Sequence, residues 1–329
     1  MPESFYSFVD NLSDDDFASL KKAVARRENI EKYGAATFEE LAYQYERKIV
    51  CPKCGSESVV KNGLSHSGRQ RFLCKDCGRK FTYLSKSIFS STKLDLDKIS
   101  KTIVLMTFNL PLEAIEEVVD ISHPTAYLWR QKILAAVNGW QDRVVLKGRV
   151  WIDETYIFDS RILHEDGYQV KRGLSKNLIC IAVGIDQYEN IYVKICGNGK
   201  PSGKRILSVF KDHIEPGSTL VHDGENAHNM LIDKLGLISE THIYNDKNPE
   251  YIKNMALINN LCSWLKRYLY RFIGMKLDYL QLYLDWFAYL FRVKKQDEKW
   301  PKNKRVLRHL ILSDAEFTRG YYLLHHHFC

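Results

Sequence analysis

Residues 149–157 read Arg149-Val-Trp-Ile-Asp-Glu-Thr-Tyr-Ile157, a run of strand-forming residues that carries Asp153 amid apolar residues. β-Branched and aromatic residues favour β-strands. A carboxylate buried in such a strand requires a partner for its charge. The stretch therefore predicts the first strand of a folded core and marks Asp153 as a candidate functional residue.

The residues that follow predict the rest of this core. Further strands are expected over 177–186, 190–196, 218–223 and 241–245, a helix over 202–213, and two long helices over 249–272 and 276–293. This order is typical of an α/β, RNase H-like core, a mixed five-stranded sheet with flanking helices. In that fold the first and fourth strands are neighbours, so Asp153 and Asp223, which ends the fourth strand, should lie side by side.

Two adjacent carboxylates repel each other unless a cation lies between them. A pair of Mg²⁺ ions about 4 Å apart can activate a nucleophile and stabilise a leaving oxygen, and hard cations prefer the oxygen ligands that aspartate supplies. The alternative is that each aspartate is only a cap or turn residue at a strand end. Glu154 should point to the opposite face of its strand, because side chains alternate there, and it is of secondary interest.

Four of the eight cysteines form a second motif. Cys51 and Cys54 form one closely spaced pair, Cys74 and Cys77 form another, and nineteen residues separate the pairs. This is the spacing of a four-cysteine zinc site, in which two tight turns present four thiolates to one tetrahedral ion. Short strands at 58–63, 69–73 and 79–83 complete a zinc ribbon. With all four positions filled by cysteine, the single Zn²⁺ is structural.

The predicted ribbon is strongly basic. Residues 51–93 hold nine Lys/Arg and two acidic residues, and residues 46–150 carry a net charge of +8 within a chain whose total is also +8. Such an excess suits a polyanion. The candidate DNA contacts in the ribbon are Arg69, Arg71, Arg79 and Lys80. The alternative is that the zinc site only stabilises the fold and the ribbon does not contact nucleic acid.

Helical apolar spacing follows at 94–108, 112–119 and 124–137, with a three-residue turn before the third segment. Ser122 can cap that segment and Pro124 suits its first position. A helix, a short helix, a tight turn and a polar-faced helix form a helix-turn-helix, although the turn lacks glycine. The third helix should expose Thr125, Tyr127, Arg130 and Gln131 to DNA; the alternative is a plain helical linker.

The combined pattern resembles the bacterial insertion-sequence DDE transposases that carry an N-terminal zinc ribbon. The resemblance rests on the two cysteine pairs, on Trp151-Ile-Asp-Glu-Thr-Tyr156, on Val221-His-Asp-Gly224 and on Ile258-Asn-Asn-Leu-Cys-Ser-Trp-Leu-Lys-Arg267. In this family a third acidic residue lies seven positions before a lysine on the long helix. Here Lys266 implies Asn259, as in the subgroup whose triad ends in asparagine. Asn260, about 100° round the helix, is a less suitable substitute.

The resemblance implies that Asp153, Asp223 and Asn259 bind two catalytic Mg²⁺ or Mn²⁺ ions. It also implies that Lys266 holds a DNA phosphate; the alternative is that Lys266 only keeps the helix surface solvated. It implies nicking at the end of the insertion sequence and attack of the freed 3′-OH on target DNA. The partners would be double-stranded DNA, as terminal inverted repeats and target, and further copies of the chain, as a dimer or higher oligomer. The expected location is the bacterial cytoplasm, at the nucleoid. Two alternatives are a catalytically inactive DNA-binding regulator and a nuclease that cuts without joining.

These patterns divide the chain into five regions. We expect an N-terminal helical segment over 1–45, the ribbon over 46–90, the helix-turn-helix over 91–144, the catalytic domain over 145–295 and a basic tail over 296–329. The chain has no apolar run near the ~20 residues of a membrane span and no signal-peptide pattern at its start. We therefore expect a soluble, intracellular protein.

Overall fold

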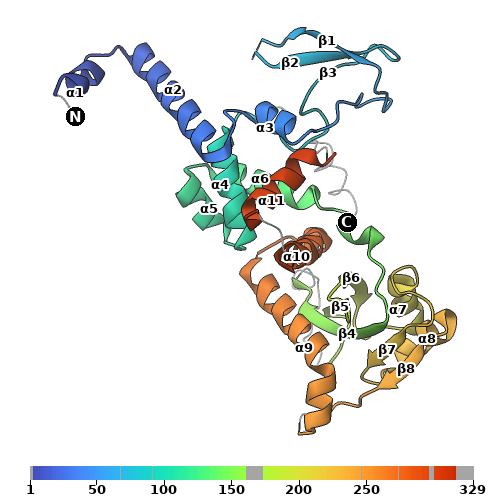
Figure 1. Ribbon diagram of the computed structural model, residues 1–329. Coiled ribbons are helices and arrows are strands. Elements are labelled where there is room, and N and C mark those ends of the chain that lie inside the picture. Colours follow the sequence, from blue (N-terminus) through green and yellow to red (C-terminus); the bar gives the residue numbers. More distant parts are fainter. Residues whose placement is uncertain are drawn as a thin grey trace, which may run out of the picture. The chain divides into compact units, whose positions relative to one another are not determined.

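The computed structural model describes residues 3–66, 68–90, 92–160, 173–245, 247–272, 274–295 and 300–315 (Figure 1). The chain forms two compact units. Of the described residues, the first unit comprises 3–106, 115–136 and 303–315, and the second comprises 107–114 and 137–302. Among the described residues, no helix combines the length and apolarity that crossing a bilayer requires.

Three helices open the first unit: α1 (Glu3–Asp10), α2 (Asp14–Tyr33) and α3 (Phe38–Gln44). The hydroxyl of Ser13 accepts the backbone N–H of Asp16 at the start of α2, and three aspartates in the first turn interact favourably with the helix dipole. Gly34 ends α2 in the left-handed conformation, with φ of 79°. The predicted helical segment is thus present in the described part of the region.

The zinc-ribbon sheet follows as β1 (Val59–Leu64), β2 (Gln70–Cys74) and β3 (Lys80–Thr82), in the order β1-β2-β3. Both pairs of strands are antiparallel, and Phe72 is opposite Phe81. These two rings, with centroids 5.8 Å apart, and the buried cysteines Cys51 and Cys74 form a small core. So small a core needs a further cross-link, and the metal site supplies it.

Helices α4 (Leu96–Thr107), α5 (Leu112–Val119) and α6 (His123–Ala135) confirm the three helices expected from the sequence. The turn between α5 and α6 works without glycine because Asp120 itself adopts the left-handed conformation, with φ of 54°. The Lys98 ammonium group donates to the Asp120 carbonyl at 2.6 Å and stabilises this turn.

The stretch expected as a basic tail contains another helix, α11 (Lys302–Leu312), most of which belongs to the first unit. Its buried side chains are Val306, Leu307, Leu310 and Ile311. Arg47 is buried next to its end, where the guanidinium donates to the Ile311 carbonyl at 2.6 Å and pairs with Asp314 at 2.5 Å. This part of the region is therefore packed structure.

The second unit is built on a five-stranded sheet with the order β6-β5-β4-β7-β8. Its elements are β4 (Arg149–Phe158), β5 (Leu178–Asp186), β6 (Ile191–Asn198), α7 (Gly203–Phe210), β7 (Thr219–His222), α8 (Asn229–Leu235), β8 (Ile238–Thr241), α9 (Pro249–Leu269) and α10 (Leu280–Lys295). Strands β4, β5 and β6 are antiparallel, whereas β7 and β8 run parallel to β4. The mixed sheet confirms the predicted RNase H-like α/β core.

One strand lies elsewhere than predicted. The fifth strand was expected over 241–245, but β8 covers Ile238–Thr241 and follows the short helix α8, which ends at Gly236. Three of the four β8 residues are exposed. An edge strand with so little burial has no alternation of apolar and polar residues, so its position could not be read from the sequence.

The two faces of β4 have different neighbours. Val150 and Ile152 pack in a hydrophobic core with α7 and α8. Trp151 and Asp153 point toward α9, where the Trp151 indole N–H donates to the Asn254 carbonyl at 2.8 Å and the Asp153 carboxylate lies 3.9 Å from the Cys262 sulfur. The period of two along the strand therefore puts Asp153 under α9.

Candidate active site and zinc site

The four predicted zinc cysteines converge. Their sulfur atoms all lie within 4.8 Å of one another, with Cys51 Sγ 3.5 Å from Cys77 Sγ and Cys54 Sγ 3.6 Å from Cys74 Sγ. A Zn–S bond of about 2.3 Å in a tetrahedron corresponds to sulfur atoms roughly 3.8 Å apart. The observed cluster therefore fits one structural Zn²⁺ held by four thiolates.

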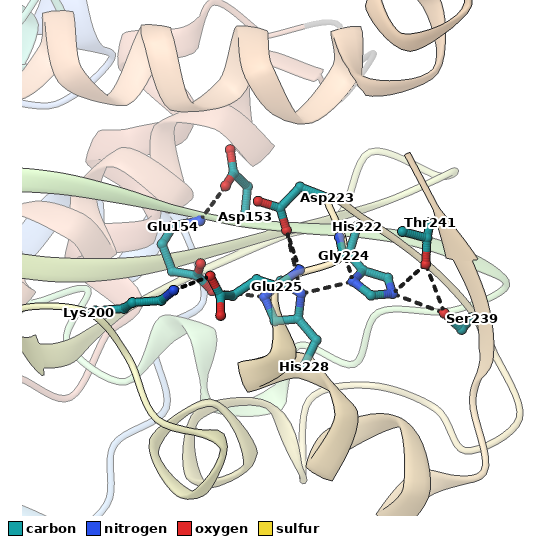
Figure 2. A network of polar contacts seen from close by, with 10 residues as sticks. All are labelled: Asp153, Glu154, Lys200, His222, Asp223, Gly224, Glu225, His228, Ser239 and Thr241. Atoms are coloured by element: carbon teal, nitrogen blue, oxygen red, sulfur yellow. Dashed lines mark hydrogen bonds and ion pairs between the residues drawn. The ribbon is translucent and has the colours of Figure 1, made fainter. Parts of the chain in front are cut away.

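Asp153 and Asp223 lie side by side, as predicted (Figure 2). Strands β4 and β7 are parallel, with Trp151 opposite Val221. Asp153 lies two residues further along β4, and Asp223 directly follows His222, the last residue of β7. Both side chains therefore leave the sheet on the α9 face. The sheet topology alone brings together two carboxylates that are seventy residues apart in the chain.

The two carboxylates are electrostatically coupled. Burial raises the pKa of Asp153 to about 7, and the nearby charges of Glu154 and Asp223 contribute to the increase. The Asp153 carboxylate accepts the backbone N–H of Glu154 at 2.8 Å, and the Asp223 carboxylate accepts that of Glu225 at 3.0 Å. A nearby cation would stabilise the ionised form of such a buried carboxylate, so the donor set fits hard divalent metal ions.

Helix α9 presents the other two predicted residues, Asn259 and Lys266, beside Cys262. Positions 259, 262 and 266 lie on one stripe of the helix, and Cys262 is the member that contacts Asp153. Burial raises the pKa of the Tyr251 phenol, and the nearby charges of Asp153 and Asp223 add to the increase. Tyr251 also hydrogen-bonds with Asn259. Asn259 and Lys266 are themselves exposed. The helix thus carries an amide and an ammonium group on its site-facing stripe.

Sequence reasoning missed two histidines. His222 precedes Asp223, and His228 lies in a 3-10 turn, Asn226–His228, after β7. Both are buried; His228 contacts Glu154 and His222, and its Nδ1 is 3.9 Å from the Asp223 carboxylate (Figure 2). Ligand atoms of His222, Asp223 and His228 lie within 4.8 Å of one another. The signal in the sequence was the segment His222-Asp-Gly-Glu-Asn-Ala-His228, but only the turn shows that its histidines converge.

Two of the predicted DNA contacts on α6 do not lie on the surface. Arg130 and Gln131 are 5% and 1% exposed, whereas the sequence predicted an exposed polar face there. The reason is that Ala126, Trp129, Ile133 and Leu134 are buried as well, so most sides of α6 are covered. Thr125 and Tyr127 are half-buried near the start of this helix. The predicted polar recognition face is therefore limited to the first turns of α6.

The four basic ribbon candidates differ in their surroundings. Arg69 pairs with Glu39 at 3.1 Å and donates to the Thr92 carbonyl at 3.2 Å, so it has a structural role. Arg71 is half-buried on β2. Arg79 and Lys80 are exposed beside the second cysteine knuckle, and of the four they are the most accessible to a polyanion.

Comparisons with known proteins agree with this architecture. Residues 48–78 match the family model of the InsA N-terminal domain, a zinc ribbon, and residues 145–292 match that of the ISXO2-like transposase domain. A Halobacterium salinarum protein described as an uncharacterized protein in transposable element ISH50 is 26% identical over 257 residues, covering 73% of this chain and 84% of that protein. The ribbon, the mixed sheet and these matches together identify an ISXO2-like transposase domain preceded by an InsA-like zinc ribbon, the architecture of an insertion-sequence transposase.

Proposed function

We propose that this transposase binds the terminal inverted repeats of its insertion sequence, nicks the DNA there and joins the freed 3′ end to target DNA. The observation that carries the proposal is the adjacency of Asp153 and Asp223 at the α9 face of the sheet. In the reaction, water hydrolyses one phosphodiester bond and leaves a 3′-OH. That hydroxyl then displaces a phosphodiester oxygen of the target strand.

Asp153 and Asp223 would hold the divalent cations, and Asn259 would complete the site with a neutral amide oxygen. Bound Mg²⁺ or Mn²⁺ would supply Lewis-acid activation of the attacking oxygen and stabilisation of the leaving oxygen. The support for this assignment is the adjacency of the two carboxylates, together with the burial and the nearby charges of Glu154 and Asp223, which raise the pKa of Asp153 to about 7. A cation stabilises the ionised form of a buried carboxylate that has negative neighbours.

Lys266 would bind a DNA phosphate close to the scissile bond. Seven residues of helix place it about 10 Å from Asn259 along the α9 axis, on the same stripe. That spacing suits a phosphate next to, but outside, the metal-binding carboxylates. The Lys266 side chain is exposed, so it can reach a ligand without displacing packed residues.

DNA-end recognition would fall to the ribbon, through Arg79 and Lys80, and to the start of α6, through Thr125. Joining requires two ends of the insertion sequence together, so we propose at least a dimer on DNA. The exposed aromatic side chains Phe5, Tyr6 and Phe8 on α1 support a protein–protein contact there, because apolar clusters on a surface mark interaction sites.

The test is a cleavage and strand-transfer assay on labelled DNA that carries the natural ends, with Mg²⁺. Asp153→Asn and Asp223→Asn should each abolish both reactions and leave end binding intact. Asp233→Asn is the matched control, since Asp233 is exposed on α8. Full activity in either site variant would refute the proposal. A wild-type protein that cleaves the DNA but does not join it would be a nuclease. A wild-type protein that binds the ends but neither cleaves nor joins would be a regulator.

A further inference from the structure

The backbone pairing of β4 with β7 stops before it reaches the two aspartates. The last paired residues are Trp151 and Val221. Beyond them, Asp153 and Asp223 depend on other contacts to keep their separation. A site that binds two cations needs that separation fixed, because catalytic groups must be held within about 0.5 Å of their productive geometry.

His228 bridges the two strands at this point (Figure 2). Its Nε2 lies 3.1 Å from the Glu154 carboxylate, and its Nδ1 lies 3.0 Å from Nδ1 of His222. Glu154 directly follows Asp153, and His222 directly precedes Asp223. One imidazole ring therefore connects the immediate neighbours of both proposed metal ligands.

The contacts of His222 define the direction of these hydrogen bonds. Gly224, with φ of 89°, turns its N–H onto His222 Nδ1 at 3.2 Å. On the other side of the ring, His222 Nε2 is 3.0 Å from the Ser239 hydroxyl on β8. His222 Nδ1 is therefore an acceptor, and His228 Nδ1 donates to it. His228 Nε2 faces a carboxylate and donates as well.

We propose that His228 is a positioning residue that holds Glu154 and His222 together and so fixes the distance between the Asp153 and Asp223 carboxylates. This inference rests on the proposed function of those two aspartates. The His228 side chain is fully buried, so the bridge is shielded from competition by water. Residues that orient metal ligands in this way typically change metal affinity about 10- to 100-fold when they are removed.

Direct ligation of one metal ion by His222, Asp223 and His228 is the competing role for these side chains, because their ligand atoms lie within 4.8 Å of one another. Direct ligation would need both Nδ1 atoms as free acceptors. The Gly224 N–H already points at His222 Nδ1, and the two Nδ1 atoms are at hydrogen-bond distance. The contacts therefore favour the bridge, and direct ligation becomes an outcome that the experiment can detect.

The experiment measures Mn²⁺ binding to the full-length, zinc-loaded protein by electron paramagnetic resonance. His228→Ala should weaken Mn²⁺ affinity about 10- to 100-fold. His228→Gln should recover part of this loss, since one amide NH₂ can donate to both neighbours. The matched control is His213→Ala: His213 also lies in the second unit, bonds the Val144 carbonyl at 2.8 Å and stacks on Tyr192, so it should affect stability but not Mn²⁺ affinity.

Three results separate the possibilities. Wild-type Mn²⁺ affinity in folded His228→Ala would overturn the bridge. The wild type could instead hold a second tightly bound Zn²⁺ besides the ribbon zinc. If His228→Ala lacks that second ion, His228 is a metal ligand and the bridge is overturned as well. If Asp153→Asn leaves Mn²⁺ binding unchanged, the proposed function itself fails. Should His228→Ala not fold, Glu154→Ala removes the acceptor at the other end of the same bridge and should weaken Mn²⁺ binding in the same direction.

Discussion

The indole N–H of Trp151 donates to the backbone carbonyl of Asn254 at 2.8 Å, which joins the strand that carries Asp153 to the helix that carries Asn259 and Lys266. Trp151 is almost fully buried. This bond and the 3.9 Å contact of Asp153 with Cys262 hold α9 against one face of the sheet. The Trp151 side chain, two residues before the first aspartate, therefore contributes directly to the register between the strand and the helix.

Trp151→Phe should weaken this register. Phenylalanine keeps an aromatic ring in place but lacks the donor, so unfolding free energy should fall by about 0.5–1.5 kcal/mol, and strand transfer should fall with it. Trp264→Phe is the control, because Trp264 is exposed on α9. Its replacement should lower the unfolding free energy by less than about 0.5 kcal/mol. Equal effects of the two substitutions in urea titrations would show that the Trp151 hydrogen bond is unimportant.

Asn259→Glu tests the third member of the triad. An added carboxylate in the metal site should lower the Mg²⁺ concentration needed for half-maximal strand transfer, because charged ligands bind divalent ions more strongly than amides do. Asn259→Ala should reduce activity severely. Asn260→Glu adds the same charge about 100° round the helix and should leave the Mg²⁺ titration unchanged. Identical titrations for the two glutamate variants would remove Asn259 from the site.

Cys74→Ser should release the zinc. The four sulfurs form one compact cluster, and small zinc modules fold only with their metal. Elemental analysis should show one Zn²⁺ per wild-type chain and much less in the variant. Circular dichroism should show loss of the ribbon strands while the second unit still melts cooperatively. A variant that keeps a full equivalent of zinc would contradict the four-cysteine site.

Asp285→Asn should change how stability depends on pH. Asp285, on α10, accepts hydrogen bonds from Gln141 at 2.7 Å and from Gln281 at 3.0 Å, yet burial raises its pKa above the ordinary value. Between the unfolded value of about 3.9 and the raised folded value, the folded state binds more protons than the unfolded state. Stability therefore falls as pH rises through that window. The asparagine variant should lose this fall; parallel thermal-melting profiles from pH 4 to 8 would contradict it.

The sequence predicted those parts of the fold that have a local signal. The cysteine spacing, the strand around Asp153 and the apolar strand before Asp223 were sufficient to predict the ribbon, the sheet and the aspartate pair. Strand β8 was misplaced because it is an exposed edge strand. Arg130 and Gln131 were misjudged because burial on α6 extends over most of its sides, which a helical spacing rule cannot anticipate.

The bridge formed by His228 could not have been predicted for a different reason. Its partners Glu154 and His222 belong to strands that are far apart in the chain, and the ring that contacts both lies in a separate 3-10 turn after β7. A histidine six residues after another has no recognisable spacing by itself. Contacts of this kind arise from the tertiary structure, whereas paired cysteines and buried strands leave a pattern in the sequence.

The most direct measurement is strand transfer of a pre-cleaved DNA end by Asp153→Cys in Mg²⁺ and in Mn²⁺. Thiolate is a soft ligand that suits Mg²⁺ poorly and accepts softer divalent ions more readily. If Asp153 binds the catalytic metal, the variant should be inactive with Mg²⁺ and should regain measurable activity with Mn²⁺, while the wild type works with both. Full activity of Asp153→Cys with Mg²⁺ would show that Asp153 is not a metal ligand and would contradict the proposed chemistry.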